Sequence, residues 1–379
     1  MAKPMYEQIH TWPNLLLAYR RASQGKRGQP NVAAFEYRLE DNLLLLRDEL
    51  ASQTYRPGPY TSFYIHEPKR RLISAAPFRD RVVHHALCNV IEPIFERSFV
   101  ADSYANRVGK GTHRALQAGQ RFARSHRYVL QLDVVQFFPS IDHAILRAIL
   151  ARKLHDPAVL WLIDQILASG VGVLSEAYDM VYFPGDDLFA AQRPRGLPIG
   201  NLTSQFWANC TLNPFDHFVK RELRGPAYVR YVDDILLFGD DKREMQSWQD
   251  ACVDRLARHR LTIHAGAHVR PVSEGFPFLG FTLYPDRRRL KRRKGVYFQR
   301  RLRRMIAAYA AGELSLDQVR ASVKGWINHV KHGNTAGLRK AVLRQRIPKK
   351  ASSQTSEAAN AQPTPDTTLD RRLPNSFEQ

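Results

Sequence analysis

Two apolar segments that carry aspartates constrain the fold of this chain more than any other feature. The first, YVLQLDVVQFF at 128–138, has the length and composition of a buried strand and carries Asp133. The second, AYVRYVDDILLFG at 227–239, predicts two apolar strands joined by a polar tip at Asp233 and Asp234. A long helical segment at 202–223 separates them. Adjacent carboxylates on apolar elements repel one another unless cations lie nearby, so the pattern predicts a metal site.

The order of these elements distinguishes that metal site from a simple turn. Asp-Asp is a common pair in polar turns. From the hairpin alone, a metal site and a simple polar turn are therefore equally good interpretations. An acid-bearing strand, a long helix and an acid-bearing hairpin in that order are typical of a polymerase palm. Nucleotidyl transfer uses two divalent ions about 4 Å apart to bind the attacking and leaving oxygens. We expect two Mg²⁺ ions, replaceable by Mn²⁺, at catalytic Asp133, Asp233 and Asp234, with Val134 included in the metal-binding set.

The charge balance indicates a polyanionic partner. Lys and Arg number 57 against 36 Asp and Glu, which gives a net charge of +21 over 379 residues. A surplus this large in a folded chain is typical of nucleic-acid-binding proteins, although composition does not separate DNA from RNA. The alternative to a polyanionic partner is that the positive charge serves only to keep the protein soluble.

The cysteines and the apolar runs predict the compartment. Cys88, Cys210 and Cys252 are far apart and form no CxxC pair, which argues against a zinc knuckle and against a disulfide scaffold. The N-terminal segment lacks the apolar core of a signal peptide, and no apolar run approaches the roughly 20 residues needed to span a bilayer. We expect a cytoplasmic protein with no membrane partner.

Two further motifs fit the polymerase interpretation. Phe138 follows Asp133 by five residues, where an aromatic ring can exclude a 2′-hydroxyl and so select dNTPs, whereas Phe137 is expected in the core. In RGLPIGNLTSQ at 195–205, Gly and Pro let the backbone approach a base pair, and Thr203 or Ser204 is expected to cap a helix.

Together these motifs resemble those of reverse transcriptases over roughly residues 30–345. QLDVVQFFPSIDH resembles motif A, RGLPIGNLTSQ motif B and YVRYVDDILLFG the YxDD motif C. FLGF at 278–281 resembles the primer grip, and KRRLISAAPFRDRVV at 69–83 resembles the finger motifs that hold the dNTP triphosphate. The resemblance implies an RNA-directed DNA polymerase that takes an RNA template, a DNA or RNA primer, and dNTPs.

Motif B also indicates a subtype. Most bacterial reverse transcriptases carry QGxxxSP there, whereas this chain reads IGxxxSQ, which is similar to the enzymes of diversity-generating retroelements. That resemblance implies copying errors at template adenines for mutagenic retrohoming, and a small accessory variability protein and an associated RNA as partners. Ile199 cannot make the hydrogen bond by which a glutamine would position the dNTP, which loosens discrimination. The alternative is an ordinary core role for Ile199.

The resemblance assigns further residues by their place in each motif. The dNTP set is Arg70, Arg71, Arg79, Phe138, Ile199, Gly200 and Gln205, with Lys69 and Arg81 behind it. The primer grip is Phe278, Leu279 and Gly280. The nucleic-acid-binding set is Arg288, Lys291, Arg292, Arg293, Arg300, Arg301 and Arg304. Some of the finger arginines could instead pair with Glu67 and Asp80.

One segment departs from the family pattern. The lysine common in motif D, which can protonate pyrophosphate, is missing from LTIHAGAHVRPV at 261–272. His264, His268 or Arg270 could substitute, or the step could go unassisted.

The expected architecture is an α+β right-hand polymerase. We place fingers at 1–127, a reverse-transcriptase palm at 128–285 with an interleaved fingers segment near 150–195, a basic helical thumb at 286–350 and a disordered tail at 351–379. Two other functions remain open: a retron-like or phage-defence reverse transcriptase without mutagenic homing, and a catalytically inactive nucleic-acid-binding protein.

Overall fold

The computed structural model describes residues 4–66, 70–225 and 227–344. The chain divides into two compact units, the first formed by residues 1–294 with 330–335 and the second by residues 295–329 with 336–379. Lys69, Glu67 and the tail predicted at 351–379 lie outside the described residues.

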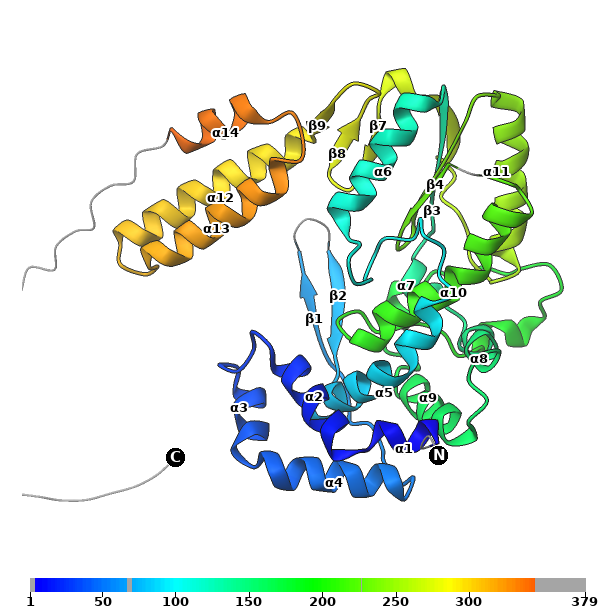
Figure 1. The fold of residues 1–379 in the computed structure, drawn as a ribbon, viewed down its shortest axis with the longest axis vertical. Helices are drawn as coiled ribbons and strands as arrows, with labels where there is room; N and C mark the ends of the chain where they lie inside the picture. The colour runs from blue at the N-terminus through cyan, green and yellow to red at the C-terminus, as the bar shows by residue number, and fades with distance from the viewer. Residues whose placement is uncertain (1–3, 67–69, 226, 345–379) are drawn as a thin grey trace, which may run out of the picture. The chain divides into compact units, whose positions relative to one another are not determined.

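A four-stranded antiparallel sheet lies at the centre of the first unit (Figure 1). Its strand order is β4-β5-β3-β6. The strands are β3 (Tyr128–Asp133), β4 (Tyr228–Tyr231), β5 (Asp234–Gly239) and β6 (His268–Pro271). The predicted strand and hairpin are therefore confirmed, and they are neighbours in one sheet.

Both faces of this sheet are buried, which explains why its strands are almost continuously apolar. Along β3, Leu130 and Leu132 belong to one core cluster and Val129 to another. The first cluster packs the sheet against α10 (Leu202–Arg221) and α11 (Lys242–Ala257). The second packs it against α6 (Thr112–Ser125) and a small sheet of β7 (Phe276–Phe278), β8 (Phe281–Leu283) and β9 (Arg288–Leu290).

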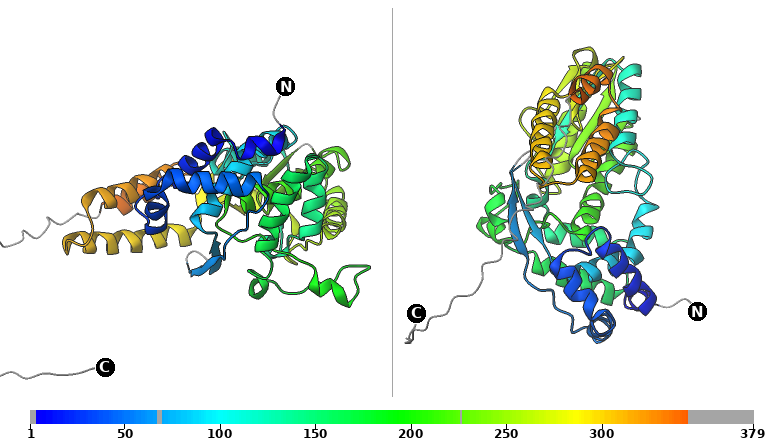
Figure 2. Two further views of the ribbon diagram at one scale, coloured as in Figure 1. Left: turned by 90° about the horizontal axis from the view of Figure 1, so that it is seen from below. Right: turned by 90° about the vertical axis from the view of Figure 1, so that its left-hand side faces the viewer.

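The N-terminal part of the first unit is helical and carries one hairpin. The helices are α1 (Met5–Ile9), α2 (Trp12–Ser23), α3 (Pro30–Tyr37), α4 (Leu39–Ala51) and α5 (Phe78–Glu96). The hairpin is formed by β1 (Thr61–Ile65) and β2 (Arg71–Ala75). Figure 1 and the right-hand view of Figure 2 show it rising away from these helices.

The remaining elements connect the sheet strands. They are α7 (Phe137–Ser140), α8 (His143–Ala151), α9 (Pro157–Ser169) and the 3₁₀ turns η1 (Ser175–Ala177), η2 (Leu188–Gln192) and η3 (Val272–Glu274). The predicted helix cap was wrong: the N-cap of α10 is Asn201 without a side-chain cap bond, and the Ser204 hydroxyl instead donates to the Pro198 carbonyl at 2.7 Å.

The second unit is built from three helices with a small core of their own. These are α12 (Arg292–Ala310), α13 (Leu316–Val330) and α14 (Ala336–Leu343). Phe298 stacks on Trp326 with ring centroids 4.3 Å apart, and Leu302, Val319 and Val342 are buried beside them. Trp326 is thus a core residue, while the basic side chains of α12 remain exposed.

Candidate active site

The three predicted aspartates meet at one end of the central sheet. Asp133, the last residue of β3, pairs directly with Asp234, the first residue of β5. Asp234 also pairs with Tyr231, which leaves Val232 and Asp233 as a two-residue turn. Directly opposed residues of antiparallel strands have Cβ atoms about 4.5–5.5 Å apart. The fold therefore gathers three carboxylates on two rigid strands and their turn.

The turn that carries Asp233 is strained and is held from inside the protein. Val232 has φ of 57°, a left-handed conformation that a β-branched residue rarely adopts. The fully buried Arg230 donates from Nη1 to the Val232 carbonyl at 3.2 Å. Arg230 also donates two hydrogen bonds, of 2.6 and 2.7 Å, to the carboxylate of the buried Asp216 of α10. The hairpin tip is thus fixed to α10 through a buried ion pair.

The motif D segment lies beside Asp133. The His264 backbone N–H donates to the Asp133 carbonyl at 3.0 Å, and its Nε2 lies 3.9 Å from Asp133 Oδ2. His268 and Arg270 lie on β6, where they pair with Gln131 and Val129. Of the three residues offered in place of the missing lysine, His264 is the one that the fold places against a predicted catalytic carboxylate.

The carboxylates suit metal ions that take their remaining ligands from a substrate and from water. Asp133 is 48% exposed, so its oxygens can reach an ion in the open. Within the described ranges, no group of three or more His, Cys, Asp or Glu side chains forms a ready-made metal cage. Magnesium in phosphate-handling enzymes uses one or two carboxylates and takes its remaining ligands from water and substrate phosphates. Val134 is 2% exposed, so any contribution to a metal comes from its main chain.

The finger arginines separate into two groups. Arg70 and Arg71 are exposed at the end of the hairpin where Ile65 of β1 pairs with Arg71 of β2, and the Arg70 guanidinium lies 4.0 Å from the centre of the Tyr64 ring. Arg79 instead forms an ion pair with Glu49 of α4, and its Nε lies 3.7 Å from Asp80. The fold therefore does not place Arg79 with the hairpin pair, and its pairing with Asp80 agrees with the alternative that the sequence left open.

The motif B loop is tied to β2. The Ser74 N–H donates to the Ile199 carbonyl at 2.9 Å. Gly200 has φ of +120°, a conformation that side chains rarely adopt, and a Cβ there would lie in tight contact at 3.1 Å from Ile73 Cγ2. Gln205 is exposed one helical turn further on. The Ile199–Gly200 backbone thus lies against the hairpin that carries Arg70 and Arg71.

Phe138 links motif A to the same loop. Its carbonyl accepts from the Leu197 N–H at 2.9 Å, and its ring meets Phe137 edge-on at 5.5 Å between centroids. Phe137 is 2% exposed and belongs to the core, as the sequence predicted, whereas Phe138 is half-buried. The more accessible ring is the one expected to meet the sugar.

The predicted primer grip is the tight turn of a hairpin. Phe278 ends β7 and is buried, and Leu279 and Gly280 follow with φ of 46° and 89°. Two successive positive φ values are typical of a two-residue hairpin turn. The segment therefore forms two short strands, and the Gly280 carbonyl in its turn accepts from the Lys291 N–H at 3.1 Å.

The predicted nucleic-acid-binding residues do not share one environment. The Arg288 guanidinium is turned inward, donating to Gln120 Oε1 at 3.0 Å and to the His332 carbonyl at 3.2 Å. The others are exposed: Lys291, Arg292, Arg293, Arg300, Arg301 and Arg304. Arg288 thus joins β9 to α6 and to residue 332, while the other six side chains are exposed to solvent.

Several supporting residues were missed from the sequence. Asn201 is 2% exposed; its Oδ1 accepts from the Ala76 N–H at 3.0 Å and its Nδ2 donates to the Ser74 and Pro198 carbonyls. Asp216 and Arg230 form the ion pair described above. A charged residue inside an apolar segment, as in LNPFDHFV and YVRYV, was the signal that could have found that pair.

Comparison with known proteins decides the family. Residues 65–283, more than half of the chain, match the family described as reverse transcriptase (RNA-dependent DNA polymerase). The chain belongs to the reverse transcriptase family. The match spans β2, motif B, the aspartate cluster and the primer-grip segment, and it makes the chain an RNA-directed DNA polymerase of a family that generally uses divalent metal ions.

The curated relatives of this reverse transcriptase include several intron-encoded proteins. It is 26% identical over 304 residues to protein YkfC of Escherichia coli, covering 68% of this chain and 75% of that one. It is 26% identical to the group II intron-encoded protein LtrA of Lactococcus lactis, over 48% of this chain and 28% of the relative. It is 27% identical to nuclear intron maturase 2, mitochondrial, of Arabidopsis thaliana, over 35% of this chain and 20% of the relative. The described part of the reverse transcriptase contains no helix long and apolar enough to cross a membrane.

Proposed function

We propose that this reverse transcriptase extends a primer along an RNA template at the cluster of Asp133, Asp233 and Asp234. The observation that carries the proposal is the cross-strand pairing of Asp133 with Asp234, with Asp233 in the turn beside them. These carboxylates would hold two Mg²⁺ ions, or Mn²⁺ in their place, which activate the primer 3′-oxygen and neutralise the leaving pyrophosphate. The chain itself supplies rigid placement, because all three carboxylates lie on strands or on a turn fixed by Arg230.

The incoming dNTP would lie between the β1–β2 hairpin and motif B. Arg70 and Arg71 are suited to bidentate contacts with the triphosphate. Arg79 would act indirectly, by fixing α4 to α5 through Glu49. Phe138 would exclude a 2′-hydroxyl, and Ile199, Gly200 and Gln205 would form the surface under the nascent pair. This arrangement is supported by the bond between Ser74 and Ile199.

The template and primer would be held by the remaining predicted elements. Phe278, Leu279 and Gly280 would contact the primer end, and the exposed basic residues of α12 would bind backbone phosphates. In the terms of a right hand, residues 1–127 act as fingers, 128–285 as palm with an inserted fingers segment near 150–195, and 286–350 as thumb.

For the biological role, we propose error-prone copying at template adenines for mutagenic retrohoming. The support is the IGxxxSQ form of motif B, with Ile199 at the position where a hydrogen-bonding side chain would position the dNTP. A small accessory variability protein and an associated RNA are the expected partners. The strong positive charge of the chain agrees with assembly on RNA.

A second role is favoured by the names of the relatives. LtrA is an intron-encoded protein, and two Arabidopsis relatives are intron maturases. A role in intron excision would use the nucleic-acid-binding surface without the metal site. Excision of an intron RNA that persists in an Asp233→Asn variant would support this second role.

The first experiment is primer extension on a defined RNA with Mg²⁺ and dNTPs, followed by sequencing of the cDNA. We expect Asp233→Asn to lower the extension rate by about a hundredfold or more, because the loss of one carboxylate weakens an electrostatic clamp on the transition state. The matched control is Asp250→Asn on the exposed face of α11, which should extend at the wild-type rate. Removal of the metal with a chelator should abolish extension by every variant.

The cDNA sequence then tests the role. Errors concentrated opposite template adenines support mutagenic copying, whereas evenly low error favours an accurate reverse transcriptase of the retron, defence or intron type. Equal activity of wild type and Asp233→Asn would contradict the assignment of the aspartate cluster.

A further inference from the structure

The motif A turn is bonded to a residue that lies 43 positions later in the chain. Gln136 stands between Asp133 and Phe138, and its φ of 45° is a left-handed conformation that residues other than glycine seldom adopt. Its side-chain amide closes a ring with Asp179: Oε1 accepts from the Asp179 N–H at 2.9 Å, and Nε2 donates to Asp179 Oδ2 at 2.8 Å. Its carbonyl accepts from the Ser140 N–H and hydroxyl at 2.9 and 2.8 Å. The strained residue is thus bonded through both its side chain and its main chain.

The neighbours of Asp179 are held by motif B. The Arg195 guanidinium lies 4.6 Å from the centre of the Tyr178 ring, and its Nη1 donates to Met180 Sδ at 2.9 Å. We call residues 178–180 the strap. The strap therefore contacts the motif A turn through Asp179 and motif B through the two residues on either side of Asp179.

The segment that contains the strap is anchored again further along by charged pairs. Asp186 accepts from both terminal nitrogens of Arg260, at 2.5 and 2.6 Å. Asp142, which is 4% exposed, accepts from Arg193 Nε at 2.6 Å. Two-point pairs between arginine and carboxylate fix orientation as well as distance. The strap is thus part of a segment tied at three places, and it can hold Gln136 in one position.

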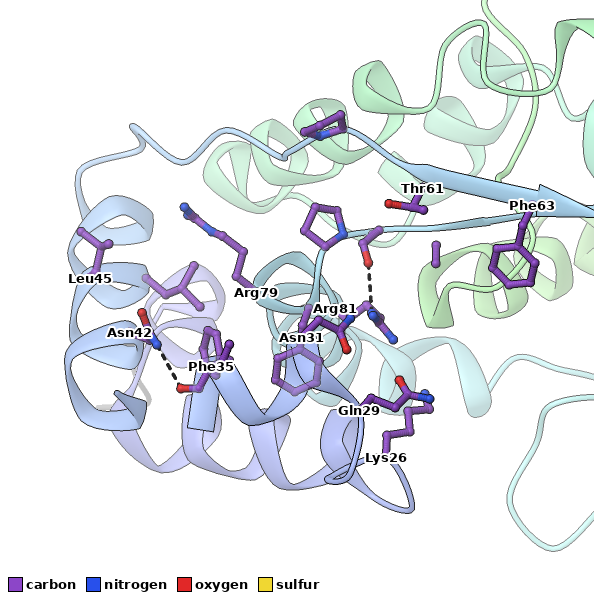
Figure 3. Close-up of a pocket in the computed structure, with 17 residues that line it drawn as sticks. Lys26, Gln29, Asn31, Phe35, Asn42, Leu45, Thr61, Phe63, Arg79 and Arg81 are labelled. Carbon is purple, nitrogen blue, oxygen red and sulfur yellow. Dashed lines mark hydrogen bonds between the residues drawn. The ribbon is translucent and has the colours of Figure 1, made fainter. Parts of the chain in front are cut away.

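Motif B is in turn fixed to the hairpin side of the fold. Asn201 Oδ1 accepts from the Ala76 N–H at 3.0 Å. Arg81, at the edge of the cavity of about 910 Å³ drawn in Figure 3, donates to the Ala76 carbonyl at 3.0 Å. With the bond between Ser74 and Ile199, these contacts hold the motif B backbone against β2. Motif B therefore offers a fixed frame against which the strap holds the motif A turn.

We propose that Gln136 is a positioning residue for sugar selection, and that the strap fixes through it the distance between the Phe138 ring and the motif B backbone. This inference rests on the proposed function, because it takes Phe138 to exclude a 2′-hydroxyl. Misplacing a group by about 1 Å can change a rate by as much as a hundredfold. A Phe138 ring that shifts by part of that distance leaves room for the extra hydroxyl, so loss of the strap costs selectivity.

The test exchanges the donors and acceptors of the bonded ring. The readout is the preference for dNTP over rNTP, as the ratio of the two kcat/KM values in single-nucleotide extension by the full chain. In Gln136→Glu a second carboxylate faces Asp179 and the bond from Nε2 is lost, so we expect the preference to fall on the order of tenfold. In the double variant Gln136→Glu with Asp179→Asn, the asparagine amide donates to the new carboxylate, and the preference should return to within about twofold of wild type.

The double variant also controls for charge beside the metal site, because it keeps the carboxylate at position 136. Should Gln136→Glu not fold, Asp179→Ala at an exposed position removes the same acceptor and should lower the preference in the same direction. Asp250→Asn, an exposed change on α11, should keep the wild-type preference.

Failure of the strap and failure of the proposed function give different results. An unchanged preference in Gln136→Glu and Asp179→Ala, or a double variant as unselective as Gln136→Glu, would overturn the positioning role of Gln136. A wild type that extends no primer would instead refute the proposed function, and a Phe138→Ala variant that keeps the full preference would refute the sugar gate within it.

Discussion

At the residue scale, buried histidines make the stability of this protein depend on pH. Burial depresses the pKa of His84 to about 3, and those of His85 and His259 to about 4, against about 6.5 in an unfolded chain. Below pH 6.5 the unfolded state therefore binds more protons than the folded one. The contribution of each neutral histidine is complete above pH 6.5 and is lost as pH falls toward its folded pKa.

We expect the melting temperature to fall steadily between pH 7 and pH 5. For His84, the free energy of unfolding should drop by about 1.4 kcal/mol per pH unit once pH is well below 6.5. Calorimetry of wild type and His84→Gln over this range measures the effect, and the variant should show the shallower dependence. Identical pH profiles for the two proteins would mean that His84 is already protonated in the fold.

Individual side chains also mark the limit of what the sequence could predict. The three aspartates were found because their positions in strands and turn follow from local apolar patterns. Arg79 was placed with the dNTP, yet its partner Glu49 lies 30 residues earlier on another helix. Asn201 was missed because two of its three bonds reach back to Ser74 and Ala76, more than a hundred residues earlier. Partners that only the fold brings together leave no local signal.

At the element scale, the buried ion pair joins α10 to β4 and to the catalytic turn. Asp216 and Arg230 are both fully buried, and Tyr228 also donates to Asp216 at 2.7 Å. We expect Asp216→Ala to lower the free energy of unfolding by about 3–5 kcal/mol, since it leaves a guanidinium buried without its partner. Denaturant unfolding monitored by circular dichroism measures this loss.

The double variant Asp216→Leu with Arg230→Met separates stability from activity. It should recover much of the lost stability, because apolar residues of similar size often replace a buried ion pair without cost. Primer extension should nevertheless stay well below wild type, since the Val232 carbonyl loses the donor that holds its strained conformation. Full activity in this double variant would show that the turn needs no support from Arg230.

Elements were predicted best where one apolar pattern runs without interruption. The strand, hairpin and helix predicted at 128–138, 227–239 and 202–223 all form, although the strand ends at Asp133 and the helix at Arg221. The region at 12–51 forms three helices, α2, α3 and α4, with Pro30 at the start of α3. The turn at Leu279 was not expected, because a leucine with positive φ contradicts its local preference.

At the scale of the whole molecule, positive charge should dominate the affinity for a template–primer duplex. We expect the triple variant Arg300→Ala, Arg301→Ala and Arg304→Ala to weaken binding and to reduce the slope of log affinity against log salt by about 2–3. Fluorescence anisotropy with a labelled duplex at several salt concentrations measures the slope. The three side chains are exposed on α12, so the fold should be unaffected.

A matched triple variant controls for total charge. Lys242→Ala, Arg243→Ala and Arg258→Ala remove the same charge from exposed positions of α11 and its end. This control should leave the salt slope nearly unchanged. Equal slopes for the two triple variants would mean that charge acts only through the net value and that α12 makes no direct phosphate contacts.

The buried Asn201 has a consequence for how such a chain can change over generations. It joins residues 74–76 to residues 198–201, which lie more than a hundred positions away. A substitution that moves either backbone breaks bonds in the other, so the two segments must be inherited as a matched pair. The stretch between α9 and motif B is tied in the same way, since Asp179 bonds to Gln136 and Asp186 pairs with Arg260. Exchange of one tied segment between distant relatives therefore requires exchange of its counterpart.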